Sequence, residues 1–134
     1  MKFLNLFIYL CFCCLILNAQ HKDIVIPQKV RAAFNSAYPN ATAIKWEKEK
    51  KDYEAGFMLG AKHLSVLYTA AGELKEIETR ITEKDLPEAA RKLALSKGTI
   101  KEAAKIQTAT GQIKYEAEVN GKDLLFDEKG NMIQ

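Results

Sequence analysis

The sequence predicts an α+β domain of two tandem repeats, each an α-helix followed by four β-strands, that share one antiparallel sheet. Apolar residues recur at helical spacing in two short segments, and alternating apolar and polar residues follow each segment. In addition, the motif VLYTAAGEL at 66–74 returns as LLFDEKGNM at 124–132, with its aromatic residue and its glycine in the same places. A repeated motif of this kind indicates that the chain contains one structural unit twice.

The first repeat is expected over 24–81. Pro27 suits the first turn of a helix over 26–39, Val30 and Phe34 fall on one face of that helix, and Pro39 ends it. Four strands should follow at 42–47, 52–59, 63–68 and 73–81, because apolar and polar residues alternate there between glycine-containing turns. In the first of these strands we expect Thr42, Ile44 and Trp46 to point to one side.

The second repeat is expected over 82–134 and keeps the same order. Pro87 begins a helix over 86–95, and Gly98 is placed to cap its end. Strands are expected at 100–109, 112–119 and 122–126, with a short final strand at Met132-Ile133. Asn120-Gly121 is a strong signal for a tight hairpin between two of them.

Matched segments align the two repeats. The pair Ile26-Pro27 corresponds to Leu86-Pro87, and the tripeptide YEA occurs at 53–55 and again at 115–117. Clean alternation is typical of antiparallel strands that have one packed face and one face in water. We therefore expect one long sheet with both helices lying on the same face.

The first nineteen residues have the pattern of a secretory signal peptide, with Lys2 before an apolar run and cleavage expected after Ala19. The mature chain is then a single domain over 20–134, periplasmic or secreted, with no stable membrane insertion. A lipoprotein signal is the alternative, because Cys11, Cys13 and Cys14 lie in this segment; however, a small residue normally precedes the lipidated cysteine, and none does here.

Composition then excludes several classes of function. All three cysteines leave with the signal, so the mature chain has no disulfide, no thiol catalysis and no cysteine-bound zinc. Without Lys2 it carries 19 basic and 17 acidic residues, interleaved along the chain, which argues against a nucleic-acid partner. Two histidines give no metal cluster. The acidic turn 127–131 weakly suggests calcium, but its counterpart at 69–73 has one carboxylate, so we expect no metal or cofactor.

The alternation assigns each strand residue to one of two sheet faces. Aromatic residues expected in the core beneath the helices are Trp46, Tyr53, Phe57 and Tyr115. The opposite face would carry the partner-binding residues, and apolar side chains on it would form a patch if they lie together. These candidate binding residues are Glu54, Met58, His63, Ser65, Leu67, Lys114, Glu116, Asp123 and Leu125.

Two carboxylate pairs bear on catalysis. Glu116 shares its strand face with Glu118, and Glu76 shares its face with Glu78; such pairs can perform acid–base hydrolysis when burial raises one pKa. Lysines occur close to both pairs in the sequence, and the face is expected to be solvated, so cross-strand ion pairs are the favoured role. No nucleophile elbow accompanies any serine, and we expect no enzyme.

The mature chain resembles the PepSY-like, β-lactamase-inhibitor-like (BLIP-like) domains that some Gram-negative bacteria export. The resemblance rests on "IP" at the helix start, "YP" at its end, the lone Trp46, "YEAGF" and the two aromatic-x-x-x-Gly turns. It implies a fold whose helices cover one sheet face while the other face grips a protein or peptide, as an inhibitor of an exported hydrolase would. Fold alone does not fix activity. A sensor or carrier of a small apolar ligand, held near Trp46 and Tyr53, is the alternative, and a hydrolase is the third hypothesis.

Overall fold

The structure is a computed structural model that describes residues 24–133, so the expected signal peptide over 1–19 lies outside the described residues. Helices and strands alternate along the chain in two blocks. The first block is α1 (Gln28–Ala37), β1 (Thr42–Glu49), β2 (Asp52–Leu59), β3 (Lys62–Tyr68) and β4 (Leu74–Ile81). The second is the 3-10 turn η1 (Glu83–Asp85), α2 (Glu88–Lys97), β5 (Ile100–Thr108), β6 (Ile113–Val119) and β7 (Lys122–Asp127).

The seven strands form one sheet in chain order, and every neighbouring pair is antiparallel. The predicted α+β fold with a helix before each set of strands is therefore confirmed. The last strand of the second block is reduced to a single bridge between Phe126 and Met132, next to which the Ile133 N–H donates to the Leu125 carbonyl at 2.8 Å. The second block thus has three full strands where the first has four.

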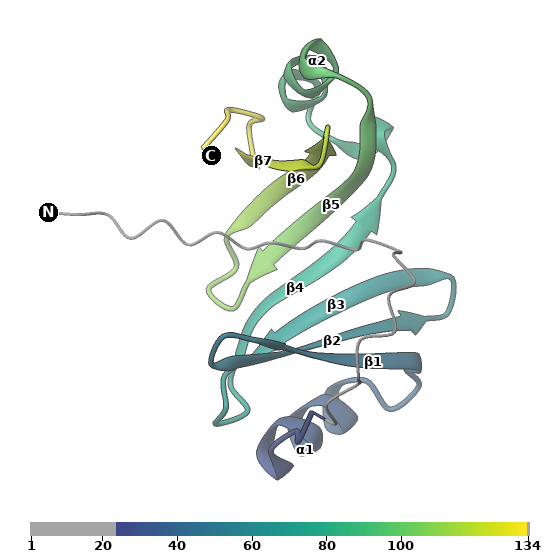
Figure 1. Cartoon of the computed structure of the whole chain (residues 1–134), viewed down its shortest axis with the longest axis vertical. Helices are drawn as coiled ribbons and strands as arrows, with labels where there is room; N and C mark the ends of the chain where they lie inside the picture. Colours follow the sequence, from purple (N-terminus) through teal and green to yellow (C-terminus); the bar gives the residue numbers. More distant parts are fainter. Residues whose placement is uncertain (1–23, 134) are drawn as a thin grey trace, which may run out of the picture.

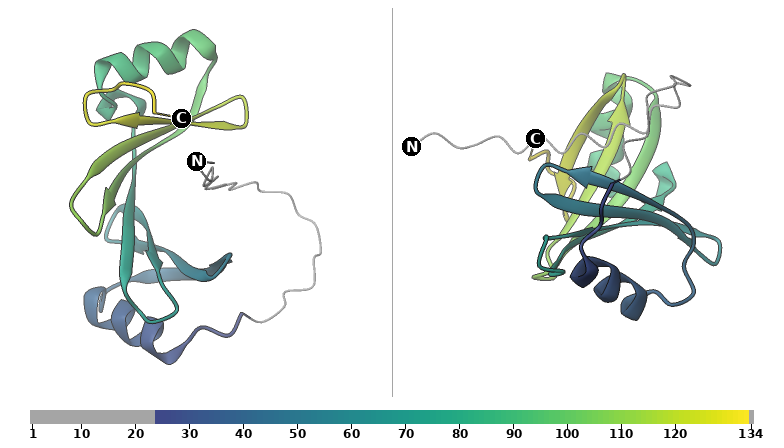
Figure 2. Two further views of the ribbon diagram at one scale, coloured as in Figure 1. Left: turned by 90° about the vertical axis from the view of Figure 1, so that its left-hand side faces the viewer. Right: turned by 60° about the horizontal axis from the view of Figure 1, so that its bottom comes forward.

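The sheet is strongly bent, with β4 at the bend (Figure 1). The left view of Figure 2 shows β1 to β3 with α1 on one side of β4, and β5 to β7 with α2 on the other. Both helices lie on the outer, convex side. The inner side is concave and carries no helix, and we call it the open face.

Two separate apolar clusters hold the helices to the convex face. The first lies under α1, where Phe34 is 1% exposed and contacts Trp46 and Phe57 edge-to-face at centroid distances of 5.2 and 5.0 Å. The second lies under α2 and is built mostly of alanines, with Leu86, Val119 and Phe126. Burying one large apolar side chain stabilises the fold by about 1.5–3 kcal/mol, and each aromatic pair adds about 1 kcal/mol.

The aromatic residues expected in the core lie on the convex face. Phe57 is fully buried, and Trp46 and Tyr53 are partly buried against the cluster under α1. Tyr115 packs in the same way against the cluster under α2. Aromatic rings therefore fill the space between sheet and α1, where a small apolar ligand had been one hypothesis.

The repeated motif is a repeated turn. In the turns that begin at Thr69, Thr108 and Asp127, the first side chain accepts the backbone N–H of the residue four places on, and the glycine N–H donates to the first carbonyl. The turn glycines Gly72 and Gly130 have φ of 82° and 86°, a region that favours glycine. Each also sits against a helix: an added Cβ would lie 2.7 Å from the Lys29 carbonyl at Gly72, and 2.8 Å from the Ala90 nitrogen at Gly130.

Three local features differ from the sequence prediction. Pro27 and Pro87 are N-cap residues and not the first helical residues, while α2 runs two residues past 95 to Lys97, with Gly98 as its C-cap. The strict alternation expected over 42–47 is wrong, because β1 has a bulge between Thr42 and Lys45, with Ala43 at φ 52°. An extra residue of this kind reverses the side on which the preceding residues point.

Candidate functional site

The strand register defines which side chains share the open face. Ser65 lies between Gly56 of β2 and Glu78 of β4, and Ala104 of β5 lies between Arg80 of β4 and Glu116 of β6. Residues two apart on these strands point to the same side. By this rule the register places all nine candidate binding residues on the open face: Glu54, Met58, His63, Ser65, Leu67, Lys114, Glu116, Asp123 and Leu125.

A cavity of about 200 Å³ lies on the open face across the bend of the sheet. Its floor is made of small residues, among them Gly56, Ser65 and Ala104, because a side chain without bulk leaves space above a strand. At Gly56 an added Cβ would meet no atom within 4 Å. A single buried water needs only about 15 Å³, whereas drug-sized ligands occupy about 300–1,000 Å³, so the cavity has room for one side chain.

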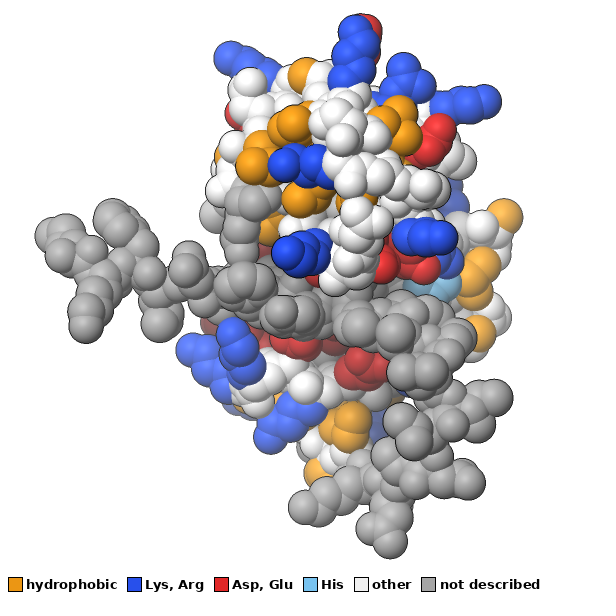
Figure 3. All heavy atoms as spheres, turned by 45° about the horizontal axis from the view of Figure 1, so that its top comes forward, with side chains coloured by type: hydrophobic (Ala, Val, Ile, Leu, Met, Phe, Trp, Pro, Cys, Tyr) orange, Lys and Arg blue, Asp and Glu red, His pale blue; other side chains and the backbone are white. Residues whose placement is uncertain are grey.

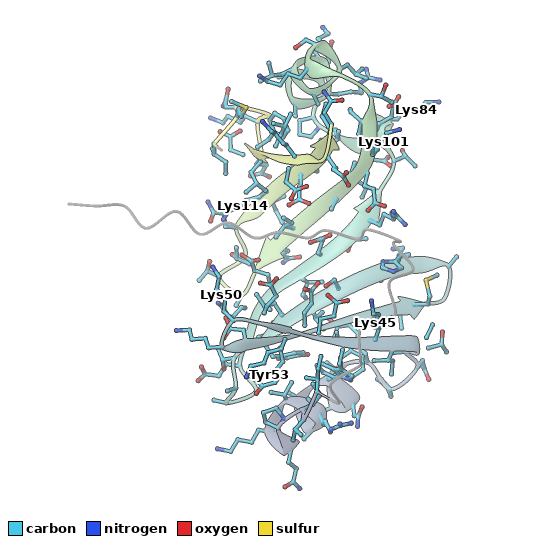
Figure 4. The ribbon with its side chains drawn as sticks, viewed as in Figure 1. Lys45, Lys50, Tyr53, Lys84, Lys101 and Lys114 are labelled. Carbon is cyan, nitrogen blue, oxygen red and sulfur yellow. The ribbon has the colours of Figure 1, made fainter. Side chains whose placement is uncertain are left out.

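Most of the charged residues that line this cavity are acidic. The lining includes five glutamates, two basic residues and His63, and its charged members are Lys45, Glu47, Glu54, Glu78, Arg80, Glu102 and Glu116. In the space-filling view, Asp and Glu side chains gather across the middle of the molecule (Figure 3). Figure 4 places Lys45 on β1 in the lower half and Lys114 on β6 in the upper half, on opposite sides of the bend.

Several of these charges are paired within the face. Lys45 Nζ lies 2.8 Å from Glu47 Oε1, Arg80 Nη2 forms an ion pair with Glu102, and Ser65 Oγ donates a hydrogen bond to Glu54. Two carboxylates are left. Within residues 24–133, the structure gives neither Glu78 nor Glu116 a hydrogen bond or an ion pair.

Burial acts strongly on these two side chains. Glu116 is 7% exposed and Glu78 is half-buried. Burial, and after it the neighbouring carboxylates, raise the pKa of each from 4.5 to about 8, with Glu54 acting on Glu78 and Glu78 acting on Glu116. Both groups are therefore largely protonated at pH 7.

Neighbours on the same face show the same effect. Burial raises the pKa of Glu54, which the hydrogen bond from Ser65 partly offsets, and burial also raises the pKa of Asp123. Carboxyl groups that crowd together in a poorly hydrated hollow favour their neutral form. The open face thus gathers carboxyl groups that favour their neutral form, and a bound cation would favour their ionised form.

The sequence predicted a solvated face on which carboxylates pair with lysines, and this prediction is wrong for Glu78 and Glu116. Lys75 binds Asp52 at 2.6 Å, and Lys122 is opposite Val119, on the convex side. Of Lys75, Lys114 and Lys122, which are the lysines near the carboxylate pairs in the sequence, only Lys114 lies on the open face. The physical reason is the bend, which turns the carboxylates of β2, β4 and β6 toward one hollow that alternation in the sequence cannot show.

The three apolar candidates are not brought into one patch. Met58 pairs with His63 near one end of the β2–β3 hairpin, while Leu67 pairs with Glu54 toward the other end. Four residues of strand separate His63 from Leu67, roughly 13 Å. Leu125 lies on β7 beyond the bend, and none of the three lines the cavity.

Glu78 belongs to the site but was not among the binding residues predicted from the sequence. Its place in the alternating segment 73–81 gives its face, beside Glu76. The small floor residues were missed as well, although Gly56 interrupts a strand of large residues, a pattern that marks close approach or open space.

No group of His, Asp and Glu side chains within 24–133 is arranged to hold a metal ion. In the acidic turn at 127–131, the Asp127 carboxylate accepts hydrogen bonds from the Lys129 and Asn131 backbone and from the Asn131 side chain, which lower its pKa. Its oxygens hold the turn, as the hydroxyl of Thr69 does in the first repeat.

Comparison with known proteins gives the family. Residues 18–62 and 53–134 match the family described as "Putative beta-lactamase-inhibitor-like, PepSY-like". The chain belongs to this PepSY-like family. The two matched segments overlap at 53–62 and together span most of the chain, and the family description is of an inhibitor-like protein. A search of curated proteins gives no match.

Solved structures of Bacteroides proteins are similar to the PepSY-like domain over most of its length. A "putative periplasmic" protein of Bacteroides eggerthii is 24% identical with a TM-score of 0.71, over 83% of this chain and 88% of the other. A DUF2874 family protein of Bacteroides uniformis is 22% identical, with a TM-score of 0.69 over 81% and 86%. A BLIP-like protein of Bacteroides fragilis is 25% identical, with a TM-score of 0.60 over 84% and 86%.

Proposed function

We propose that this PepSY-like domain is a non-enzymatic binding protein of the cell envelope that grips a protein or peptide against its open face. The observation that carries the proposal is the asymmetry of the sheet. Helices cover the convex face, whereas the concave face holds a cavity lined by side chains that no other part of residues 24–133 covers. The inhibitor-like description of the family supports a binding role, and inhibition of an exported hydrolase is one form of it.

The proposal places the protein outside the cytoplasm. The apolar first nineteen residues support export with cleavage near Ala19, and a structural relative is described as periplasmic. Neither helix of residues 24–133 is long and apolar enough to cross a membrane. Fractionation of the source cell, with the mass of the mature protein, tests this: a mass that begins at Gln20 is expected. A chain that keeps residues 1–19 in the cytoplasmic fraction contradicts export, and a lipid-modified mass contradicts cleavage after Ala19.

The binding role is tested by filling the cavity. Gly56→Trp places a large side chain where an added Cβ meets no atom, and Gln107→Trp adds the same bulk on the convex face of the same sheet. Residues 20–134 are immobilised and exposed to envelope extract, and captured proteins are identified by mass spectrometry. We expect a partner that binds the wild type and Gln107→Trp and is lost with Gly56→Trp.

Equal capture by both variants, or no specific capture by the wild type, contradicts binding through the open face. The same preparations are assayed against panels of chromogenic glycosides, peptides and β-lactams. Protonated carboxyls such as Glu116 can act as general acids, so turnover that disappears in Glu116→Gln would establish a hydrolase and overturn the non-enzymatic role. We expect no turnover.

A further inference from the structure

We propose that the cavity on the open face receives one basic side chain, an arginine or a lysine, of the bound protein or peptide, with Glu78 and Glu116 as its counter-charges. This inference rests on the proposed function and specifies the chemistry of its partner. It depends on three observations made within residues 24–133: the volume of the cavity, the pairing of its charges, and the burial of Glu116.

Charge pairing gives the sign of the ligand. The two basic residues that line the cavity each have a carboxylate partner, Glu47 for Lys45 and Glu102 for Arg80. Ser65 donates to Glu54. What is left is a pair of carboxyl groups, because Glu78 and Glu116 line the same cavity and contact no donor from the described part of the chain. A cation complements this arrangement.

The burial of Glu116 distinguishes a built site from a solvated acidic surface. A carboxyl that is 7% exposed and has no partner is costly, because buried ionisable groups normally pair. Ala104 and Ile106 of β5, which are 6% and 5% exposed, lie between the strands of the two glutamates and offer them no polar side chain. An arriving guanidinium or ammonium would supply the missing donors.

The size and the ligand set argue for a side chain over a metal ion. A cavity of about 200 Å³ exceeds the space for one ion or water and is smaller than a typical small-molecule site. Its walls present no metal-holding group among residues 24–133. The cavity is open to the concave side, so a side chain that projects from a polypeptide lying along that face can enter it.

Binding and ionisation are coupled at this site. A cation favours the charged carboxylates, so binding releases protons and strengthens as pH rises from 6 to 9. The groups that face the pair include Lys45 and Glu47 on β1, Glu54 on β2, His63 on β3, Glu76 and Arg80 on β4, Glu102 on β5, Lys114 and Glu118 on β6, and Asp123 on β7. An arginine probe stays charged over this range, so a change in affinity with pH reports ionisation of the protein and not of the probe.

The test is an NMR titration of residues 20–134 with the peptide acetyl-Gly-Arg-Gly-amide, in which the side-chain carboxyl signals of glutamate are observed. We expect shifts at Glu78 and Glu116, binding at least ten-fold tighter at pH 9 than at pH 6, and a ~10- to 100-fold loss in Glu116→Gln. Glu118→Gln, on the same strand and face, is the matched control and should bind as the wild type does. Glu78→Gln gives a second, independent variant.

Other probes separate the alternatives. Acetyl-Gly-Gln-Gly-amide has no charge and should not bind; equal binding would overturn the inference. Calcium ions or spermidine that shift the same carboxyls more strongly than the arginine peptide would assign the cavity to a metal or a free polyamine. If the arginine peptide leaves Glu78 and Glu116 unchanged while Gly56→Trp still abolishes partner capture, the basic-side-chain inference fails and the proposed function stands.

Discussion

The buried carboxyl of Glu116 predicts an unusual dependence of stability on pH. Its pKa is about 8 in the folded protein and about 4.5 in the unfolded chain, so between these values the folded state holds a proton that the unfolded state releases. The contribution of this carboxyl to the free energy of unfolding is therefore largest below pH 4.5 and declines as pH rises toward 8. At roughly 1.4 kcal/mol per pH unit, the loss for this one group reaches about 3 kcal/mol at pH 7.

Glu116→Gln removes the titrating group and keeps its shape. The variant should be close to the wild type at pH 5 and more stable than it at pH 8, by about 2–4 kcal/mol. Part of the gain comes through Glu78, because its carboxyl raises the pKa of Glu116. The difference between variant and wild type isolates the effect, since all other groups titrate in both.

Urea unfolding followed by the fluorescence of Trp46 measures this difference. Trp46 is the single tryptophan of the chain and packs against Phe34 beneath α1. Curves at half-unit steps from pH 5 to pH 8.5 give the two stability profiles, with Glu118→Gln as the control on the same strand. A wild-type profile that rises with pH relative to Glu116→Gln would refute the assignment of a raised pKa to this carboxyl.

Three further predictions concern the scaffold. Gly72→Ala should lower the free energy of unfolding by about 2–4 kcal/mol, because it combines positive φ with a contact on the Lys29 carbonyl. Gly111→Ala is the control: it has φ 87° and open space, and should lower stability by about 1 kcal/mol. Equal losses in urea unfolding would exclude the contact. Phe34→Ala should cost about 3–5 kcal/mol in the same assay, and a loss under 1 kcal/mol would show that α1 does not depend on its aromatic cluster. Asp52→Asn breaks the ion pair with Lys75 of β4 and should lower stability in urea by about 1–2 kcal/mol at pH 7; an unchanged stability would contradict it.

Local patterns in the sequence carried most of the fold. Alternation around Phe57 and Tyr115 gave the packed face of their strands, and the repeated glycine turns gave the duplication, because both depend only on neighbouring residues. The bulge at Ala43 was not visible in this way. A positive φ at an alanine reflects the fit of β1 to β2, which no local preference of alanine would indicate.

The site was harder to predict for a related reason. The sequence placed Glu116 beside Glu118 on the open face and paired Glu78 with Glu76 on a strand face, but the burial of Glu116 and Glu78 depends on the curvature of seven strands together. Gly56 and Ala104 come from different repeats, and only the folded sheet shows that they form one floor. The pKa of each carboxyl depends on its burial in that hollow, and no pattern of charges along the chain shows this burial.

The presence of two cores has a mechanical consequence. β4 contributes Ile77 to the cluster under α1 and Ile81 to the cluster under α2, and the β4–β5 ladder joins the halves through main-chain hydrogen bonds. A change in the twist of this strand pair would change the angle between the two halves of the sheet while both cores keep their packing.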